Sequence, residues 1–246
     1  MKKRSEQFNL SERCYPDIST RRVFDDHLAR YNFAKIFVAD KIVLDIACGE
    51  GYGSDIFKKA GASEVYGADI DSGTIDAARE KYKGINFIIA DAAKTLFNDN
   101  FFDAVVSFET WHHLESYQNF IPEMYRILKP NGLLIISVPN EKIIYLNPLH
   151  KNFLTEFYRF DFNKDKIKKY LKNYFVIKNW YGQRFVKRIY ANPLARFLFF
   201  VGGLVSGEIN RRADIIYKLA DGPTIKPLLY NNTRYLIAIC RKKDLK

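Results

Sequence analysis

The chain has 246 residues, enough to bury a core of its own, and it fits one domain or one domain with a sizeable attachment. Its 48% hydrophobic content is ordinary for a globular protein, and no apolar run reaches the roughly 18 residues that a membrane-spanning helix needs. The basic first residues are not followed by an apolar segment, so no secretory signal is predicted. The three scattered cysteines lack metal-binding spacing, which favours reduced thiols and a cytoplasmic compartment.

The net charge of +11 is unevenly distributed along the chain. Residues 1–140 carry 17 Lys and Arg against 20 Asp and Glu, whereas residues 141–246 carry 22 against 8. The asymmetry predicts that the second half meets something anionic, such as an acidic or phosphorylated sugar, a lipid headgroup or nucleic acid. The alternative is a basic surface that is merely solvated.

A helix is expected from Ser19 onward, because apolar residues there fall on one stripe. The next apolar run, Ile42–Ile46, predicts a buried strand, and Gly49, Gly51 and Gly53 follow it at alternate positions. A helical pattern then begins near Tyr52. This strand, glycine turn and helix let a ligand lie against bare backbone at a helix N-terminus.

The later elements alternate between strands and helices, which predicts a parallel sheet with right-handed crossovers. In chain order, the expected segments are strand 64–71, helix 74–82, strand 85–90, strand 102–109, helix 118–128, strand 133–138, helix 163–171 capped by Asn163, strand 174–181 and strand 234–240.

The stretch KIVLDIACGEGYG, residues 41–53, resembles motif I of the class I S-adenosylmethionine-dependent methyltransferases. Leu44, Asp45, Cys48, Gly49 and Gly51 match the motif, and Ala47 replaces its first glycine. The resemblance extends over residues 41–140. Residues 12–31, the leader segment, resemble the same part of a bacterial methyltransferase subgroup that is often linked to glycan modification. The resemblance over residues 41–140 implies a Rossmann-like, doubly wound α/β fold: a seven-stranded, mostly parallel sheet with an antiparallel last strand and helices on both faces. The implied cofactor is S-adenosyl-L-methionine, and its product is S-adenosyl-L-homocysteine.

Asp69 ends the second strand, where a carboxylate can accept protons from both ribose hydroxyls, and Ile70 would then lie against adenine. Asp91 and Ala92 follow the third strand, where the resemblance implies adenine contacts; a turn cap is the alternative for Asp91. Arg13 pairs with the cofactor carboxylate or is an ordinary surface arginine. The full set of expected cofactor residues is Asp45, Ala47, Gly49, Gly51, Asp69, Ile70, Asp91, Ala92, Phe108, Glu109 and Arg13.

Methyl transfer from a sulfonium is a one-step displacement that needs no metal, and no metal site is predicted. If the acceptor is a hydroxyl, a histidine base suits it because its pKa lies near the working pH. His113, after the fourth strand, is the first choice, His112 the second and His150 the third. Adjacent side chains are expected to point in different directions, so His112 and His113 should not both serve. A histidine that merely holds the loop is the alternative.

The domain prediction has three parts: residues 1–40 as a helical cap, residues 41–181 with 234–246 as the cofactor-binding core, and residues 182–233 as a substrate-selecting insertion. Within the insertion, residues 192–212 are apolar with flanking arginines. They pack over the acceptor pocket or contact the inner membrane face peripherally.

The predicted function is methylation of a hydroxyl or phosphate-type oxygen on a sugar or glycan intermediate, as in polysaccharide biosynthesis. The resemblance leaves three alternatives open. One is a lipid or small-molecule methyltransferase at the membrane. Another is a nucleic-acid methyltransferase, disfavoured because the family's D/N-P-P motif is missing after the fourth strand. The last is a non-catalytic protein that binds the cofactor.

Overall fold

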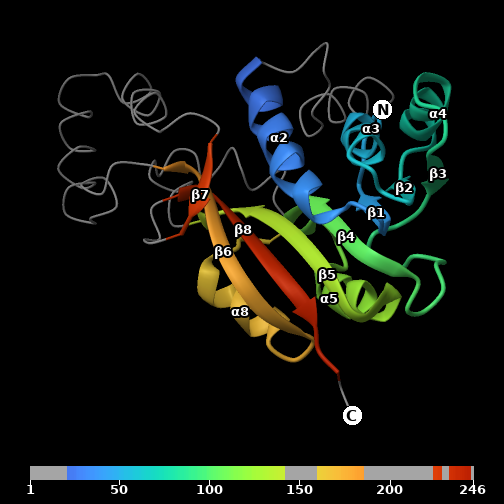
Figure 1. Cartoon of the computed structure of the whole chain (residues 1–246). Coiled ribbons are helices and arrows are strands. Elements are labelled where there is room, and N and C mark those ends of the chain that lie inside the picture. Colours follow the sequence, from blue (N-terminus) through green and yellow to red (C-terminus); the bar gives the residue numbers. More distant parts are fainter. Residues whose placement is uncertain (1–20, 142–159, 186–223, 229–232, 245–246) are drawn as a thin grey trace, which may run out of the picture.

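The computed structural model describes residues 21–141, 160–185, 224–228 and 233–244. They contain one eight-stranded sheet with helices on both faces (Figure 1). In sheet order, the strands are β3 (Asn86–Ile89), β2 (Glu64–Asp69), β1 (Ile42–Ile46), β4 (Phe102–Phe108), β5 (Leu128–Pro139), β8 (Thr233–Lys242), β6 (Phe175–Phe185) and β7 (Ile225–Pro227).

Strands β1 to β5 are parallel, and β8 is inserted antiparallel between β5 and β6. The predicted parallel sheet and its antiparallel last strand are therefore confirmed. The predicted count of seven strands is wrong, because β7 pairs with the outer edge of β6. Strand β6 also continues to Phe185, past the predicted end at Tyr181, since β8 pairs with it as far as Phe185 and β7 pairs with its other edge as far as Gln183.

Part of the predicted insertion 182–233 is thus sheet. Its remainder, residues 186–223 and 229–232, lies outside the described residues, as do most of the residues 1–40 assigned to the cap. No helix in the described ranges is both long and apolar enough to cross a membrane.

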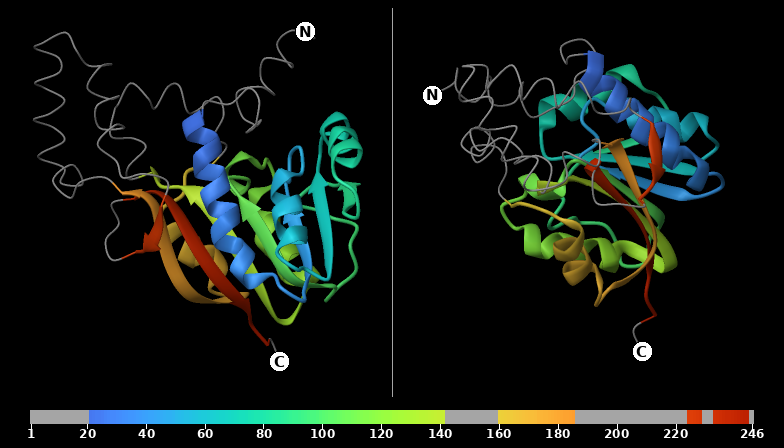
Figure 2. Two further views of the ribbon diagram at one scale, coloured as in Figure 1. Left: turned by 45° about the horizontal axis from the view of Figure 1, so that its top comes forward. Right: turned by 90° about the vertical axis from the view of Figure 1, so that its left-hand side faces the viewer.

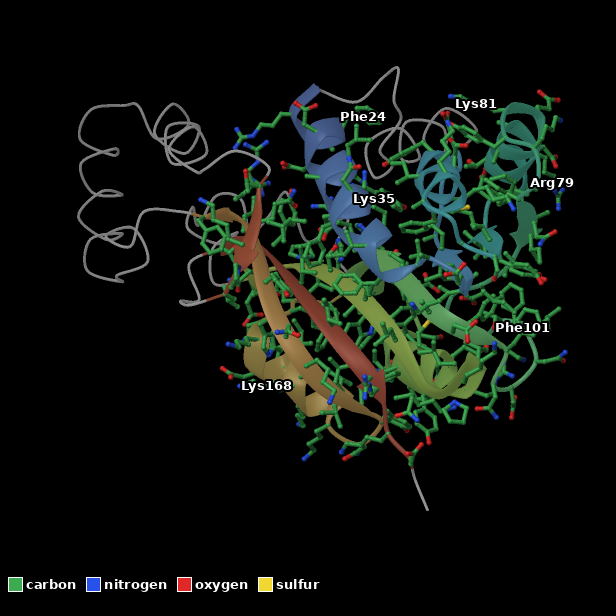
Figure 3. All side chains as sticks on the ribbon, in the orientation of Figure 1. Phe24, Lys35, Arg79, Lys81, Phe101 and Lys168 are labelled. Carbon is green, nitrogen blue, oxygen red and sulfur yellow. The ribbon has the colours of Figure 1, made fainter. Side chains whose placement is uncertain are left out.

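Helices cover both faces of the sheet, because successive side chains of β1 point to opposite faces and both sets include apolar residues. Val43 packs with α2 (Arg21–Ala34) and α3 (Tyr52–Lys59), whereas its neighbour Leu44 packs with α5 (Tyr117–Ile127) and α8 (Lys164–Leu171). Helix α4 (Ser72–Lys81) lies beside α3. The two views of Figure 2 show helices on both faces of the sheet. Figure 3 labels Arg79 and Lys81 on α4 near one edge of the sheet and Lys168 on α8 towards the other.

Side-chain caps begin two of these helices. Asp71 accepts the Thr74 N–H at 2.8 Å and caps α4. Asn163 accepts two backbone N–H groups at the start of α8, which confirms the predicted cap. The ends of most elements agree with the sequence prediction to within a few residues. Strand β5 differs more: it begins at Leu128 rather than at residue 133, and its pairing with β4 is irregular near this start.

A buried carboxylate joins β1 to the two helices above it. Asp45 is 1% exposed and accepts hydrogen bonds from the Ser54 hydroxyl of α3 at 2.7 Å and the Tyr31 hydroxyl of α2 at 3.1 Å. The Tyr31 ring also lies edge-on to Tyr52 and Phe108, with centroids 5.4 and 5.2 Å away. Burial raises the pKa of Asp45 to about 7; the two hydrogen bonds oppose this rise, and the charge of Asp69 adds to it.

The raised pKa predicts how stability changes with pH. Below about pH 4, Asp45 is protonated in both the folded and the unfolded chain, and its contribution is fully present. As the pH rises to 7, the unfolded chain loses this proton first, so the free energy of unfolding falls by up to about 1.4 kcal/mol per pH unit. Asp45→Asn removes the titration. In urea unfolding, its stability relative to the wild type is expected to rise between pH 4 and 7.

Asp76→Asn, on the exposed side of α4, is the matched control and should follow the wild-type pH profile. Parallel profiles for Asp45→Asn and the wild type would show that Asp45 does not titrate in this range.

Candidate cofactor and acceptor site

The sheet has one point at which the chain reverses its direction of growth. From β1 the chain adds β2 and then β3 on one side, and it returns to place β4 on the other side of β1. In doubly wound sheets, ligands bind in the crevice beyond the carboxyl ends of the strands at such a point. The segments after β1, β2, β3 and β4 all meet this edge, and they hold most of the residues that the sequence singled out.

The turn after β1 has the backbone geometry that its glycines predict. Ala47, Gly49 and Gly51 have φ angles of 60°, 55° and 80°, in the left-handed region. A side chain costs energy there, which explains why the motif usually has glycine where this chain has Ala47. A Cβ added at Gly49 would meet no atom within 4 Å, so this backbone borders open space. At Gly51 it would lie 2.6 Å from the Phe87 ring.

Asp69 ties this turn to the end of β2. Its Oδ2 accepts the Gly49 N–H and its Oδ1 accepts the Asp71 N–H, both at 3.1 Å. The side chain is 6% exposed, whereas the adjacent Ile70 is 67% exposed. A carboxylate has about four lone-pair sites, so an oxygen that accepts one N–H can also accept a hydroxyl proton. The carboxylate, the bare turn and an exposed apolar side chain therefore share one edge.

The end of β3 lies against the end of β2, because the Ala90 N–H donates to the Asp69 carbonyl at 2.9 Å. Asp91 follows and is exposed; its Oδ1 accepts the Ala93 N–H at 2.8 Å, so it does cap a turn. Ala92 is buried. The turn cap, which was the alternative for Asp91, is present, and the carboxylate still reaches solvent at this edge.

Strand β4 ends in two residues expected at the cofactor. Phe108 is buried against Tyr31, beneath α2. Glu109 has a φ of 55° and accepts a hydrogen bond from the Ser137 hydroxyl at 2.6 Å. Burial raises the pKa of the Glu109 carboxyl, while the positive charges of Arg30 and Arg234 oppose the rise.

The two adjacent histidines lie in a short 3-10 turn, η2 (Trp111–His113), directly after β4. Their ring centroids are 3.9 Å apart, so the prediction that they point in different directions is wrong. The fully buried Trp111 occupies the core side of the turn, with its ring centroid 4.2 Å from that of Phe162. The two imidazoles lie together. They differ in exposure: His112 is 2% exposed, and His113 is partly exposed. Burial lowers the pKa of His112 well below its usual value, and the charges of His113 and Arg30 lower it further.

Two predicted site residues, Arg13 and His150, lie outside the described residues. Within the described ranges, no group of three or more His, Cys, Asp or Glu side chains is arranged to hold a metal ion.

A polar network that the sequence did not predict joins α2 to the end of β6 and the start of β8. Asp26 accepts from the Arg184 Nε at 2.7 Å, and Arg30 donates to the Gln183 side chain at 2.5 Å. The residues lie more than 150 positions apart in the chain. The available signal was the four-residue spacing of Arg22, Asp26 and Arg30, which puts three charges on one side of a helix that must pack on a sheet.

Comparisons with known proteins agree with this geometry. A family model described as "Methyltransferase domain" matches residues 44–136, from β1 to β5. A probable S-adenosylmethionine-dependent methyltransferase of Mycolicibacterium smegmatis is 31% identical over 147 residues, which cover 56% of each chain. A fatty-acid O-methyltransferase of the same organism is 31% identical over 122 residues, which cover 46% of this chain and 44% of that protein. The chain thus spans about half the length of the curated relatives it matches.

The fold is similar to a crystal structure from Thermotoga maritima described as a SAM-dependent methyltransferase and possible histamine N-methyltransferase. The TM-score is 0.63 at 16% identity, with 89% of this chain and 90% of that chain covered. At this identity, the similarity concerns the fold alone. The chain is therefore similar to S-adenosylmethionine-dependent methyltransferases in sequence over β1 to β5 and in fold over most of its length.

Proposed function

We propose that this protein transfers the methyl group of S-adenosylmethionine to an oxygen atom of a small organic acceptor. The observation that carries the proposal is the meeting of Gly49, Asp69 and Ile70 at the strand-order reversal. There, open space borders a bare turn, beside a carboxylate and an exposed apolar side chain.

In this proposal, the methionine part of the cofactor lies along the turn at 47–51, and Asp69 accepts the ribose hydroxyl protons. Ile70 covers one face of the adenine, and Asp91 with the backbone of Ala92 meets its edge. Support comes from the shared edge on which these residues lie, and from the bond between Gly49 and Asp69, which fixes the turn relative to β2. Binding in this orientation brings the sulfonium towards the turn after β4, where Phe108 and Glu109 end the strand.

The enzyme's main contribution is to hold the acceptor oxygen, the methyl carbon and the sulfur in line, and positioning of this kind lowers barriers by roughly 7–11 kcal/mol in the best cases. For a hydroxyl acceptor, His113 takes the proton as the oxygen attacks the methyl carbon and the carbon–sulfur bond breaks. His113 suits this role better than its neighbour because it is partly exposed, whereas His112 is buried and its lowered pKa makes it a weaker base.

The acceptor class has two candidates. The similarity to a fatty-acid O-methyltransferase favours an apolar acceptor that ends in an oxygen acid. The basic second half of the chain and the resemblance of its leader segment favour a sugar or glycan intermediate. Incubation with labelled S-adenosylmethionine and pools of fatty acids, sugar phosphates and nucleotides separates them: mass spectrometry should detect the gain of one methyl in one pool. Tight cofactor binding with no transfer to any pool would instead favour a non-catalytic protein.

Asp69→Ala is expected to weaken the binding of S-adenosylhomocysteine by about 1–3 kcal/mol, because buried ribose hydroxyls lose their acceptor. Titration calorimetry measures the change. Asp76→Ala, an exposed carboxylate on α4, is the control and should bind as tightly as the wild type. If Asp69→Ala also keeps wild-type affinity, Asp69 has no part in holding the ribose.

His113→Ala is expected to lower kcat by about 10²–10⁴-fold while the affinity for S-adenosylhomocysteine stays within a few-fold, because a general base acts on the chemical step. Turnover assays with the acceptor found in the pool experiment give kcat, and calorimetry gives the affinity for S-adenosylhomocysteine. Gln118→Ala, exposed on the adjacent helix α5, controls for nonspecific effects. Full turnover in His113→Ala would show that the reaction needs no base at this position.

A further inference from the structure

Four arginines gather at the carboxyl edge of the sheet among the described residues, beside the turn that carries the histidines. They surround two carboxylates and come from three elements. The cluster, called the arginine cluster below, comprises Arg22, Arg30, Arg184 and Arg234 with Asp26 and Glu109.

The topology explains why these residues meet. Strand β8 runs antiparallel to β5 and β6, so it begins at the edge where they end, and Tyr235 pairs with both Pro139 and Gln183. Arg234 therefore lies at the start of β8 and Arg184 at the end of β6. Helix α2 brings the other two arginines against this edge, with Arg30 stacked 4.8 Å from the centre of the Tyr235 ring.

The positive charge of the cluster exceeds its negative charge. The carboxylate of Asp26 forms an ion pair with Arg184 at 2.7 Å, in which both side chains are less than 10% exposed. The Glu109 carboxyl accepts a hydrogen bond from the Ser137 hydroxyl, and its raised pKa means that its negatively charged form is less stable than that of an ordinary glutamate. Burial is the largest cause that lowers the pKa of Arg22, and the nearby charges of Arg184 and Arg234 lower it further.

Arg30 has a buried hydrogen-bond donor without a partner. It is 1% exposed, and its Nη1 donates to Gln183 at 2.5 Å. Its Nε, however, is buried without a hydrogen-bond partner. Nearly all buried donors in proteins are satisfied, so such a group requires a reason. A guanidinium can offer its Nε and one Nη together to two oxygens of a carboxylate or phosphate.

We infer that the arginine cluster, with Arg30 at its centre, binds the oxyanion of the methyl acceptor, a carboxylate or a phosphate. The charge of Arg30 acts on both Glu109 and His112, so an anion held there lies beside the turn after β4. An anion offsets the mutual repulsion of the arginines and supplies the partner that Nε lacks. The anion site stands on these contacts alone; only its assignment to the acceptor rests on the proposed function.

The test titrates the full chain with inorganic phosphate and, separately, with acetate, at constant ionic strength set by sodium chloride. Calorimetry and thermal melting should both show saturable binding to the wild type by at least one of the two anions, and the tighter one identifies the class of oxyanion. Arg30→Gln is expected to bind that anion at least about 10-fold more weakly, the order for a lost charge-assisted pair. Arg241→Gln, an exposed arginine further along β8, is the matched control and should bind like the wild type.

Absence of saturable binding to the wild type, or equal binding by Arg30→Gln, overturns the inference. If Arg30→Gln does not fold, Arg30→Lys tests the site instead, because lysine keeps the positive charge but lacks the paired N–H donors of the guanidinium. Weaker binding by that variant supports the site, and unchanged binding refutes it.

A parallel titration with S-adenosylhomocysteine separates the two proposals. Failure of the wild type to bind it refutes methyl transfer and leaves the anion result valid. With both ligands bound, Arg30→Gln should raise the KM for the acceptor at least about 10-fold and leave the affinity for S-adenosylhomocysteine unchanged. An unchanged KM for the acceptor would show that the bound anion is not a group of the acceptor.

Discussion

The hydrogen bond between the Asp69 carboxylate and the Gly49 N–H fixes the centre of this molecule. The turn after β1 holds Ala47, Gly49 and Gly51 in left-handed backbone, a geometry that the chain does not adopt by default. The bond attaches that turn to the next strand. Because β4 lies on the other side of β1, the residues directly after β4 lie at the same edge of the sheet as this turn. A shift of this loop would therefore change the distance between the residues proposed to bind the cofactor and the histidines.

A second polar contact secures the helices that cover the turn. Asp45 lies under α2 and α3 and receives one hydroxyl from each. Taking a carboxylate out of water costs energy, and the two hydroxyls offset only part of that cost, so the pKa of Asp45 is raised to about 7. The chain accepts this cost directly beneath its glycine turn, a pattern common at functional sites, where stability gives way to geometry.

The two halves of the carboxyl edge have different chemistry. On the side of β1, β2 and β3, acids and bare backbone suit a cationic nucleoside. On the side of β5, β8 and β6, arginines outnumber the carboxylates among them. The uneven charge of the sequence thus has a structural counterpart within the described residues, and Arg30 and Arg22 of α2 join the basic side although they belong to the acidic half of the chain.

The sequence by itself determined the elements whose signals are local. The apolar run 42–46 with its alternate glycines predicted β1, the turn and α3, and Asn163 predicted the start of α8, because strand period, turn chemistry and caps act over a few residues. Tertiary structure alone decided the rest. It paired β7 with β6, brought the His112 and His113 rings together and joined Asp26 to Arg184 across 158 positions. Such contacts depend on how distant segments pack, and a buried arginine reads like an exposed one until the sheet edge that covers it is known.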